Sequence, residues 1–189
     1  FNFIPIYWMA SEDHDFDEIS SFKFQEKKFQ WKQDLIGPVG KLPLDKLKFT
    51  LDDFESYLGN NNEANQIREL IKNSYRESAN LSEATFKLVN QLFGKYGLLV
   101  LEPNKKDLKK LFINFFKKEL SDQFSFHSID KQINNLKDNY SKTYSPQVNP
   151  RNINLFYLLP EGRYRIEKND NKFVVKDTGK FFSENELID

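Results

Sequence analysis

Apolar residues gather along the chain into three short runs, which predict β-strands. The first run covers residues 1–9, FNFIPIYWM, and its aromatic and β-branched content is typical of strands. Pro5 indicates that this strand lies near a sheet edge or begins properly at Ile6, because proline cannot donate a ladder hydrogen bond. The other runs are residues 98–101, LLVL, and residues 153–158, INLFYL. Since such uniformly apolar runs are typical of buried strands, we expect all three in one sheet.

Alternation of apolar and polar residues predicts two hairpins. Residues 22–24 and 29–31 alternate around a charged turn, as the two strands of a half-exposed hairpin do. Residues 163–167 and 172–176 flank the turn sequence Asn-Asp-Asn at 169–171, which predicts a second hairpin near the end of the chain.

Apolar residues at helical spacing predict five amphipathic helices. They cover residues 50–58, 62–76, 82–96, 107–120 and 129–140. Residues 98–101 are followed by the turn Glu102-Pro103-Asn104 and then by the fourth of these helices. A buried strand, a turn at its carboxyl end and an amphipathic helix form the repeating unit of a parallel α/β sheet, so the sequence predicts an α/β fold.

Composition narrows the class of protein. The 189 residues suffice for one medium domain, and the 28 basic residues balance the 28 acidic ones, so no overall field directs the chain to nucleic acid or an anionic membrane. The absence of cysteine excludes disulfides, thiolate zinc sites and a cysteine nucleophile. No run approaches the roughly 20 apolar residues of a membrane span, and the N-terminus lacks a signal-peptide layout. We therefore expect a cytoplasmic protein that binds neither nucleic acid nor membrane.

Both ends of the sequence are abrupt. The chain starts without methionine, inside an apolar run, and its last residues, SENELID, stop where Ser183 would cap a new helix. We interpret the sequence as an internal piece of a longer polypeptide. Such a piece is expected to expose an apolar sheet edge or face, and to behave poorly in solution unless it self-associates.

The run SEDHD, residues 11–15, directly follows the first strand and is the first candidate for chemistry. Ligands of open α/β sheets bind beyond the carboxyl ends of the strands. His14 is there a candidate proton carrier or hydrogen-bond donor, with Asp13 or Asp15 fixing its tautomer. The alternative is that Ser11 caps a short helix and the acids favour its positive end. Both interpretations fit the sequence.

Metal binding is a further alternative, because His, Asp and Glu are ligands for magnesium, manganese or zinc. His127, in the polar stretch DQFSFHSID, is the only other histidine, so a multi-histidine zinc site would need His14, His127 and a carboxylate. We therefore predict no dedicated metal site.

Three other positions are candidates for ligand contacts. GPVGK, residues 37–41, lacks the spacing of a phosphate-binding loop and predicts a turn with Lys41 at its rim. Glu102 follows a strand and either holds a ribose hydroxyl or only precedes the turn at Pro103. Arg151, in NPRN, offers a fork suited to carboxylate or phosphate, with a plain salt bridge as the alternative. The lysines of residues 105–110 are most simply the solvated face of a helix.

Four ordered segments resemble the bacillithiol synthase family, ligases that add cysteine to complete bacillithiol in many bacteria. They are PIYWMASEDHDFDEI, GPVGKLPL, LFGKYGLLVLEPNKKDLKKLF, and QVNPRNINLFYL followed by GRYRIEK. The match runs through essentially the whole chain, and SEDHD after its apolar strand is its most specific element.

The resemblance implies a Rossmann-like core akin to class I aminoacyl-tRNA synthetases, with helical insertions. All 189 residues are then part of this ligase core, with about 45–96 as a helical insertion and 160–178 as a β-hairpin. Family members also carry sequence before the SEDHD strand and after the end of this chain, including a coiled coil, so the full-length protein is expected to be a homodimer. This chain alone is expected to be inactive.

The resemblance also implies a reaction, amide formation between the carboxyl of cysteine and the amine of glucosaminyl malate. Activation by ATP or another nucleotide is expected, and magnesium could accompany it. His14, Asp13 and Asp15 are then the catalytic candidates. Substrate-binding candidates are Ser11, Glu12, Arg151 and Asn154, and nucleotide-binding candidates are Glu102 and Lys41. The alternatives are a noncatalytic α/β binding module and a metal-dependent hydrolase that uses the SEDHD cluster, which nucleotide binding and metal analysis would distinguish.

Overall fold

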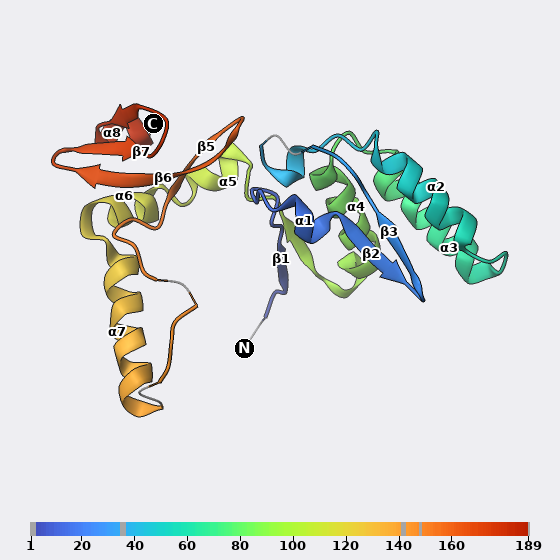
Figure 1. Ribbon diagram of the computed structural model, residues 1–189, viewed down its shortest axis with the longest axis horizontal. Helices are drawn as coiled ribbons and strands as arrows, with labels where there is room; N and C mark the ends of the chain where they lie inside the picture. Colours follow the sequence, from blue (N-terminus) through green and yellow to red (C-terminus); the bar gives the residue numbers. More distant parts are fainter. Residues whose placement is uncertain (1–2, 35–36, 141–142, 148, 189) are drawn as a thin grey trace. The chain divides into compact units, whose positions relative to one another are not determined.

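The computed structural model describes residues 3–34, 37–140, 143–147 and 149–188. It divides into two compact units (Figure 1). The first unit comprises Phe1–Lys105 with Pro160–Gly162, and the second comprises Lys106–Leu159 with Arg163–Asp189. Helices and strands occur in both units, so the chain has an α/β fold.

The first unit contains two parallel strands joined by a helical segment. β1, Ile6–Trp8, pairs with β4, Leu99–Leu101, in the register Ile6↔Leu99. Parallel strands need a long crossover, and here the crossover includes α4, Leu81–Phe93. The strands predicted at 6–9 and 98–101 are therefore confirmed.

Apolar side chains of this two-stranded sheet are exposed. Ile6 is 54% exposed, Trp8 52% and Leu99 50%. The expectation from its apolar pattern that the first strand is buried is wrong, because β1 is exposed and pairs with β4 alone among the described residues. The expected apolar exposure of the sheet is confirmed.

The core of the first unit lies instead between a hairpin and the helices. β2, Ser21–Phe24, pairs antiparallel with β3, Lys27–Gln30, which confirms the first predicted hairpin. Phe29 of β3 is fully buried and packs edge-on against Phe54 of α2, Leu47–Tyr57. This aromatic contact ties the hairpin to the helical region.

The predicted helices of the first unit are present and have clear ends. α3, Asn62–Ile71, continues into a π-helical turn, Lys72–Arg76, and α4 is followed by the 3-10 turn Gly94–Tyr96. Asn61 and Asn80 cap α3 and α4 through their side chains. Gly97 then ends the segment with a φ of 86°, a left-handed conformation that favours glycine.

The second unit begins with helices that differ from prediction. The helix expected at 107–120 is two helices, α5, Lys106–Lys110, and α6, Ile113–Asp122. The break falls at Phe112, whose N–H bonds to the carbonyl of Lys109 in a tighter turn, with φ −99° and ψ 4°. α7, Phe124–Asn139, starts earlier than the predicted 129.

The remaining strands form a separate sheet in the order β5-β6-β7-β8. These strands are Phe156–Leu159, Gly162–Asn169, Lys172–Val175 and Lys180–Phe182. β6 and β7 form the predicted second hairpin. The prediction that the strand at 153–158 shares a sheet with β1 and β4 is wrong, because β5 lies beside β6, two residues further along the chain. So short a connection makes local pairing less costly in entropy than pairing with a distant strand.

The chain ends with α8, Glu184–Ile188. The Ser183 hydroxyl accepts a bond from the Glu186 N–H, and the Glu186 carboxylate accepts from the Ser183 N–H. This reciprocal pair is a capping box, which confirms Ser183 as the predicted cap. Among the described helices, none is long and apolar enough to cross a membrane.

Candidate functional site

The SEDHD segment pairs with the GPVGK segment through backbone hydrogen bonds. Val39 N–H donates to the Asp13 carbonyl at 2.7 Å, and Gly40 N–H donates to the Ser11 carbonyl at 2.9 Å. A Cβ atom at Gly40 would lie 2.7 Å from the Ser11 carbonyl oxygen and 2.4 Å from Ser82 Oγ. Glycine is therefore required at position 40 for the two segments and α4 to approach so closely.

Ser11 and Glu102 meet at the carboxyl ends of the two parallel strands. Ser11 is 6% exposed, and its hydroxyl donates to Glu102 Oε1. The Asn104 N–H donates to the same oxygen at 3.0 Å. The other oxygen, Oε2, is shielded from solvent and has no partner among the described residues. Two donors thus fix this carboxylate in place, while its other oxygen receives no hydrogen bond from the described residues.

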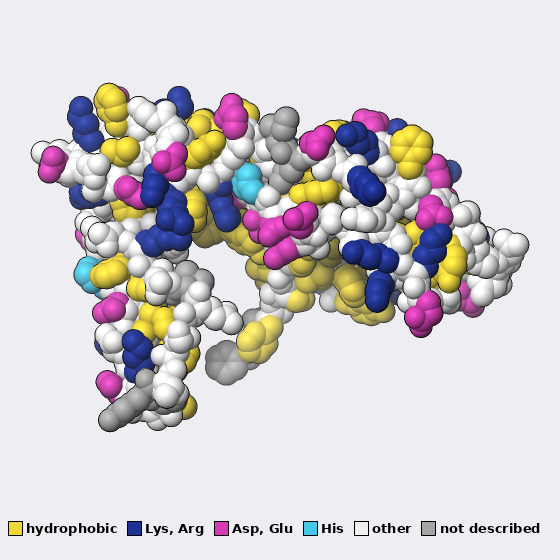
Figure 2. Space-filling view, viewed as in Figure 1, with side chains coloured by type: hydrophobic (Ala, Val, Ile, Leu, Met, Phe, Trp, Pro, Cys, Tyr) yellow, Lys and Arg dark blue, Asp and Glu magenta, His cyan; other side chains and the backbone are white. Residues whose placement is uncertain are grey.

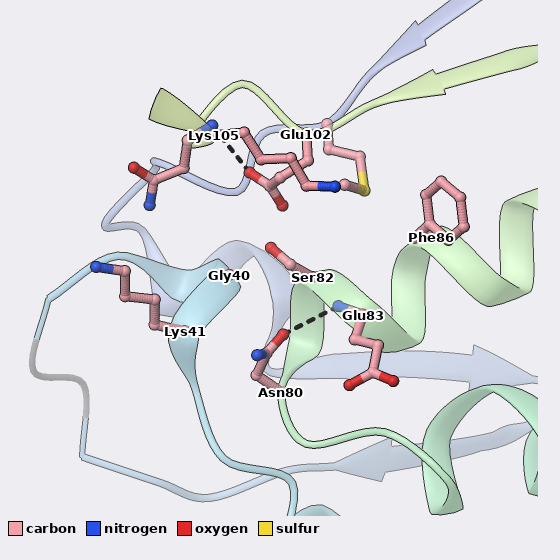
Figure 3. A pocket seen from close by; sticks show the side chains of 10 residues that line it. Gly40, Lys41, Asn80, Ser82, Glu83, Phe86, Glu102 and Lys105 are labelled. Carbon is pink, nitrogen blue, oxygen red and sulfur yellow. Dashed lines mark hydrogen bonds between the residues drawn. The ribbon is translucent and has the colours of Figure 1, made fainter. Parts of the chain in front are cut away.

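Glu102 lines a pocket of about 390 Å³ that lies wholly within the first unit. We call it the Glu102 pocket; its lining residues are Met9, Gly40, Lys41, Asn80, Ser82, Glu83, Phe86, Glu102, Asn104 and Lys105. Glu102 and Lys105 lie on one wall, Lys41 and Ser82 face them, and Phe86 lies at one end (Figure 3). The two predicted nucleotide-binding residues, Glu102 and Lys41, therefore share one pocket.

The N-terminus of α4 forms part of this pocket. The Asn80 side chain accepts a bond from the Glu83 N–H, and the Glu83 carboxylate accepts from the Ala79 N–H. The ion pair with Lys87, together with the Ala79 N–H, lowers the pKa of Glu83 below its ordinary value. Leu81 N–H donates to the Leu42 carbonyl. The backbone N–H groups of Leu81 and Glu83 in this first turn therefore have acceptors within the protein. The Ser82 hydroxyl lines the pocket and has no hydrogen-bond partner among the described residues.

Asp13, His14 and Asp15 line a second and more open concavity of the first unit, which we call the acidic depression. Its other lining residues are Phe16, Asp17, Gln33 and Asp34. Figure 2 shows acidic side chains gathered over α1, Phe16–Ile19. The Asp13 carboxylate accepts the His14 N–H at 2.7 Å, and the ring nitrogens of His14 are shielded from solvent. The three predicted catalytic residues thus lie together.

The helix after this segment is capped by Asp15 and not by Ser11. Asp15 accepts a bond from the Glu18 N–H at 3.4 Å, whereas the Ser11 hydroxyl is turned to Glu102. The interpretation of Ser11 as the cap is therefore wrong, although a short helix does begin beside the acids. Glu12, the remaining member of SEDHD, is partly buried.

Arg151 and Asn154, the other predicted substrate contacts, belong to the second unit. Arg151 is exposed and lines a pocket of that unit. The N–H of Asn154 donates to Glu119 Oε1 at 2.7 Å, and the other Glu119 oxygen accepts the Ser125 N–H. Glu119 is 3% exposed, so this part of Asn154 has a structural role.

Within the residues that the structure describes, no group of three or more His, Asp or Glu side chains could hold a metal ion. His14 lies in the first unit, whereas His127 lies on α7 in the second. The arrangement gives no support to a zinc site that uses both histidines.

Sequence reasoning missed several residues of the Glu102 pocket, among them Asn80, Ser82 and Phe86. The signal was available, because Asn80 with Glu83 three positions later is the pattern of a capping box at a helix start. Lys105 was assigned to the solvated face of a helix, but it precedes α5 and lines the pocket.

The sequence matches a family model described as Bacillithiol biosynthesis BshC, N-terminal Rossmann-like domain, over residues 1–189. Among relatives named "Putative cysteine ligase BshC", that of Flavobacterium johnsoniae is 41% identical over 100% of this chain and 35% of its own length. That of Flavobacterium psychrophilum is 44% identical over 100% of the chain and 34% of its own. That of Cytophaga hutchinsonii is 37% identical over 98% of the chain and 33% of its own.

The chain therefore spans about a third of the length of these relatives. The family match, by contrast, covers every residue of the chain. This chain belongs to the BshC family of bacillithiol biosynthesis and represents its N-terminal Rossmann-like domain.

Proposed function

We propose that the full-length protein carrying this chain joins cysteine to the amine of glucosaminyl malate. The names of its relatives, cysteine ligases of bacillithiol biosynthesis, support this reaction. The observation that carries the proposal is the Glu102 carboxylate at the carboxyl ends of two parallel strands. Ser11 and Asn104 each donate a hydrogen bond to one of its oxygens. The other oxygen is shielded from solvent and has no hydrogen-bond partner in the described part of the chain. A carboxylate oxygen that is shielded from solvent without a hydrogen bond is costly unless a ligand uses the group.

The Glu102 pocket has groups that fit a nucleotide. Lys41 and Lys105 provide two cations for phosphate oxygens, and the Ser82 hydroxyl adds a donor beside the positive end of α4. The Glu102 carboxylate is an acceptor suited to ribose hydroxyls. The absence of a side chain at Gly40 keeps the wall open beside Ser82. Magnesium would enter with the phosphates.

A bound nucleotide would activate the cysteine carboxyl for attack by an amine. In the acidic depression, Asp13 and Asp15 are suited to hold the ammonium group of cysteine, and His14 to accept a proton from the attacking amine. The paired segments 11–13 and 39–41 contribute Asp13 to the depression and Gly40 and Lys41 to the Glu102 pocket. Glu12, Arg151 and Asn154 remain proposed substrate contacts, and the cytoplasmic location and the homodimer remain predictions.

The test is the rate of cysteine addition to glucosaminyl malate by the full-length protein and its His14→Ala variant. We expect the variant to lose more than about 90% of the rate, since general acid–base groups contribute roughly 10²- to 10⁴-fold. Thermal stability recorded on the same samples shows whether a loss of rate follows from a loss of fold, since His14 is partly buried.

Two outcomes would contradict this proposal. If the unchanged protein does not bind any nucleotide, the chain is better explained as a noncatalytic binding module. If His14→Ala keeps its rate within a few fold of the unchanged protein, the acidic depression is the start of α1 and not a substrate site. Phe49→Ala on α2 is a suitable control, because Phe49 is 77% exposed and lines neither concavity.

A further inference from the structure

The second unit contains a pocket of about 390 Å³ whose charged groups, apart from Arg151, have no proposed role so far. Arg151 and Asn152 reach it from the segment before β5, and Arg165, Lys168 and Asn169 reach it from β6. We call it the Arg165 pocket. It shares no residue with the Glu102 pocket or the acidic depression.

Three cations line this pocket without a matching set of acids. Arg151 and Arg165 form no side-chain hydrogen bond or ion pair with any described residue, and Lys168 contacts only the ring face of Phe173, at 5.5 Å. Glu167 is the one acid of the lining, and it lies 3.8 Å from Lys176, a further cation. The pocket therefore carries a net positive charge.

Two guanidinium groups without a hydrogen-bonding partner that line one concavity are suited to a particular ligand. A guanidinium presents a planar fork of donors that matches the two oxygens of a carboxylate or phosphate. Two such forks match a ligand with two negative charges on neighbouring oxygens, and the amides of Asn152 and Asn169 add neutral donors. Lys168 adds positive charge to the surroundings, but strand alternation places its side chain on the opposite face of β6 from Arg165. Figure 2 shows Lys and Arg side chains gathered on the second unit over α6 and β6, consistent with a positive surface there.

We propose that the Arg165 pocket binds a doubly charged oxyanion group, either a phosphate or a pair of neighbouring carboxylates. This proposal rests on the proposed function only through Arg151, which is also a proposed substrate contact, and it is otherwise drawn from the charges of the second unit. A phosphate group and a dicarboxylate present the same chemistry to the two arginines, so the experiment distinguishes these sources.

The experiment is calorimetric titration of the full-length protein with pyrophosphate in one arm and malate in the other. We expect saturable binding in at least one arm, weakened at least tenfold by Arg165→Gln and by Arg151→Gln. Arg163→Gln is the matched control, because Arg163 lies on the same strand but its guanidinium stacks 4.7 Å from the Phe156 ring and does not line the pocket. This control should change affinity less than threefold. Affinity should also fall as salt rises.

A second pair of variants distinguishes loss of the guanidinium from a folding defect and from a general loss of positive charge. Arg165→Lys keeps the charge and the strand but removes the fork, and we expect it to bind more weakly than the unchanged protein and more tightly than Arg165→Gln. Lys23→Gln, an equal loss of charge at an exposed position of β2 that lines neither the Arg165 pocket nor the Glu102 pocket, should leave this binding unchanged. The ligase proposal is tested by a rate and at other residues, so its failure is distinct from failure of this inference. Absence of saturable binding in both arms, or equal losses in Arg165→Gln and Arg163→Gln, would overturn the inference.

Discussion

The Glu102 pocket and the acidic depression lie in the same unit and share one short segment, yet they differ in kind. Within the segment 11–15, Ser11 donates a hydrogen bond to Glu102, whereas Asp13, His14 and Asp15 line the depression. The depression collects several carboxylates in an open concavity. The pocket has a single strand-end acid, Glu102, held by two donors, with cations nearby.

This difference shows that a dense cluster of charge in the sequence does not identify the most constrained carboxylate. Exposed acids keep most of their hydration, so their placement in a loop costs little. Glu102 has lost hydration at one oxygen without gaining a described partner there. Its burial therefore has a cost that the fold does not offset, which is typical of a group kept for binding.

The largest expected effect is that of Glu102→Gln on nucleotide affinity. Glutamine has nearly the same shape and can still accept the Ser11 and Asn104 hydrogen bonds, but it removes the charge that would accept ribose hydroxyls. We expect the dissociation constant to rise by about 30- to 100-fold, because a hydrogen bond to a charged group contributes roughly 2–3 kcal/mol. Calorimetric titration of the full-length protein with ATP measures it.

The control for this variant is Glu69→Gln, an equal loss of charge at an exposed position of α3 outside both concavities. The free energy of unfolding of Glu102→Gln should be unchanged or higher, because a poorly hydrated charge is removed. If instead His14→Ala weakened nucleotide binding and Glu102→Gln did not, the roles of the two concavities would have to be exchanged.

The next effect in size is that of Gly40→Ala on stability. The new Cβ would lie 2.7 Å from the Ser11 carbonyl oxygen, a backbone atom that cannot rotate away. We expect a loss of about 1–3 kcal/mol in the free energy of unfolding, the usual range for overpacking. Urea unfolding measures it, with Gly59→Ala as control, since a Cβ there meets nothing within 4 Å. Equal effects of the two changes would mean that the close approach of the paired segments is not a constraint.

Much of the fold was predictable because it depends on local patterns. The parallel strands β1 and β4, the hairpin β2–β3 and the helix caps follow from apolar runs, alternation and cap residues. The partner of β5 was not predictable in the same way. An apolar run indicates a strand, but the choice of neighbour depended on the two-residue connection to β6.

Individual residues of the site were predictable, but which of them lie together in the structure was not. Ser11, Lys41 and Glu102 each follow from strand ends and a glycine-containing turn, but the Ser11–Glu102 hydrogen bond joins residues 91 positions apart. No periodicity carries information over that distance. Phe86 was interpreted only as part of the apolar face of a helix, and the packing of α4 against residues 39–42 is what brings it to the pocket.

The smallest expected effect is on the pH dependence of stability, and it compares one carboxylate in each unit. The pKa of Glu83 is lowered by Lys87 and by the Ala79 N–H, so its contribution to stability is present above the ordinary carboxyl pKa of 4.5 and is lost as pH falls through the lower, folded value. Glu83→Gln keeps an acceptor for Ala79 but loses the ion pair. The variant should therefore be slightly less stable than the unchanged protein near neutral pH, and the difference should vanish in acid.

Glu186, whose pKa is lowered by Ser183, caps α8 in the second unit and provides the control. Thermal unfolding and ATP titration at several pH values should show that only Glu83→Gln also tightens nucleotide binding near neutral pH, because only Glu83 lines the Glu102 pocket and its carboxylate would repel phosphate oxygens. An equal change of nucleotide binding in Glu186→Gln would show that the first turn of α4 has no special relation to the pocket.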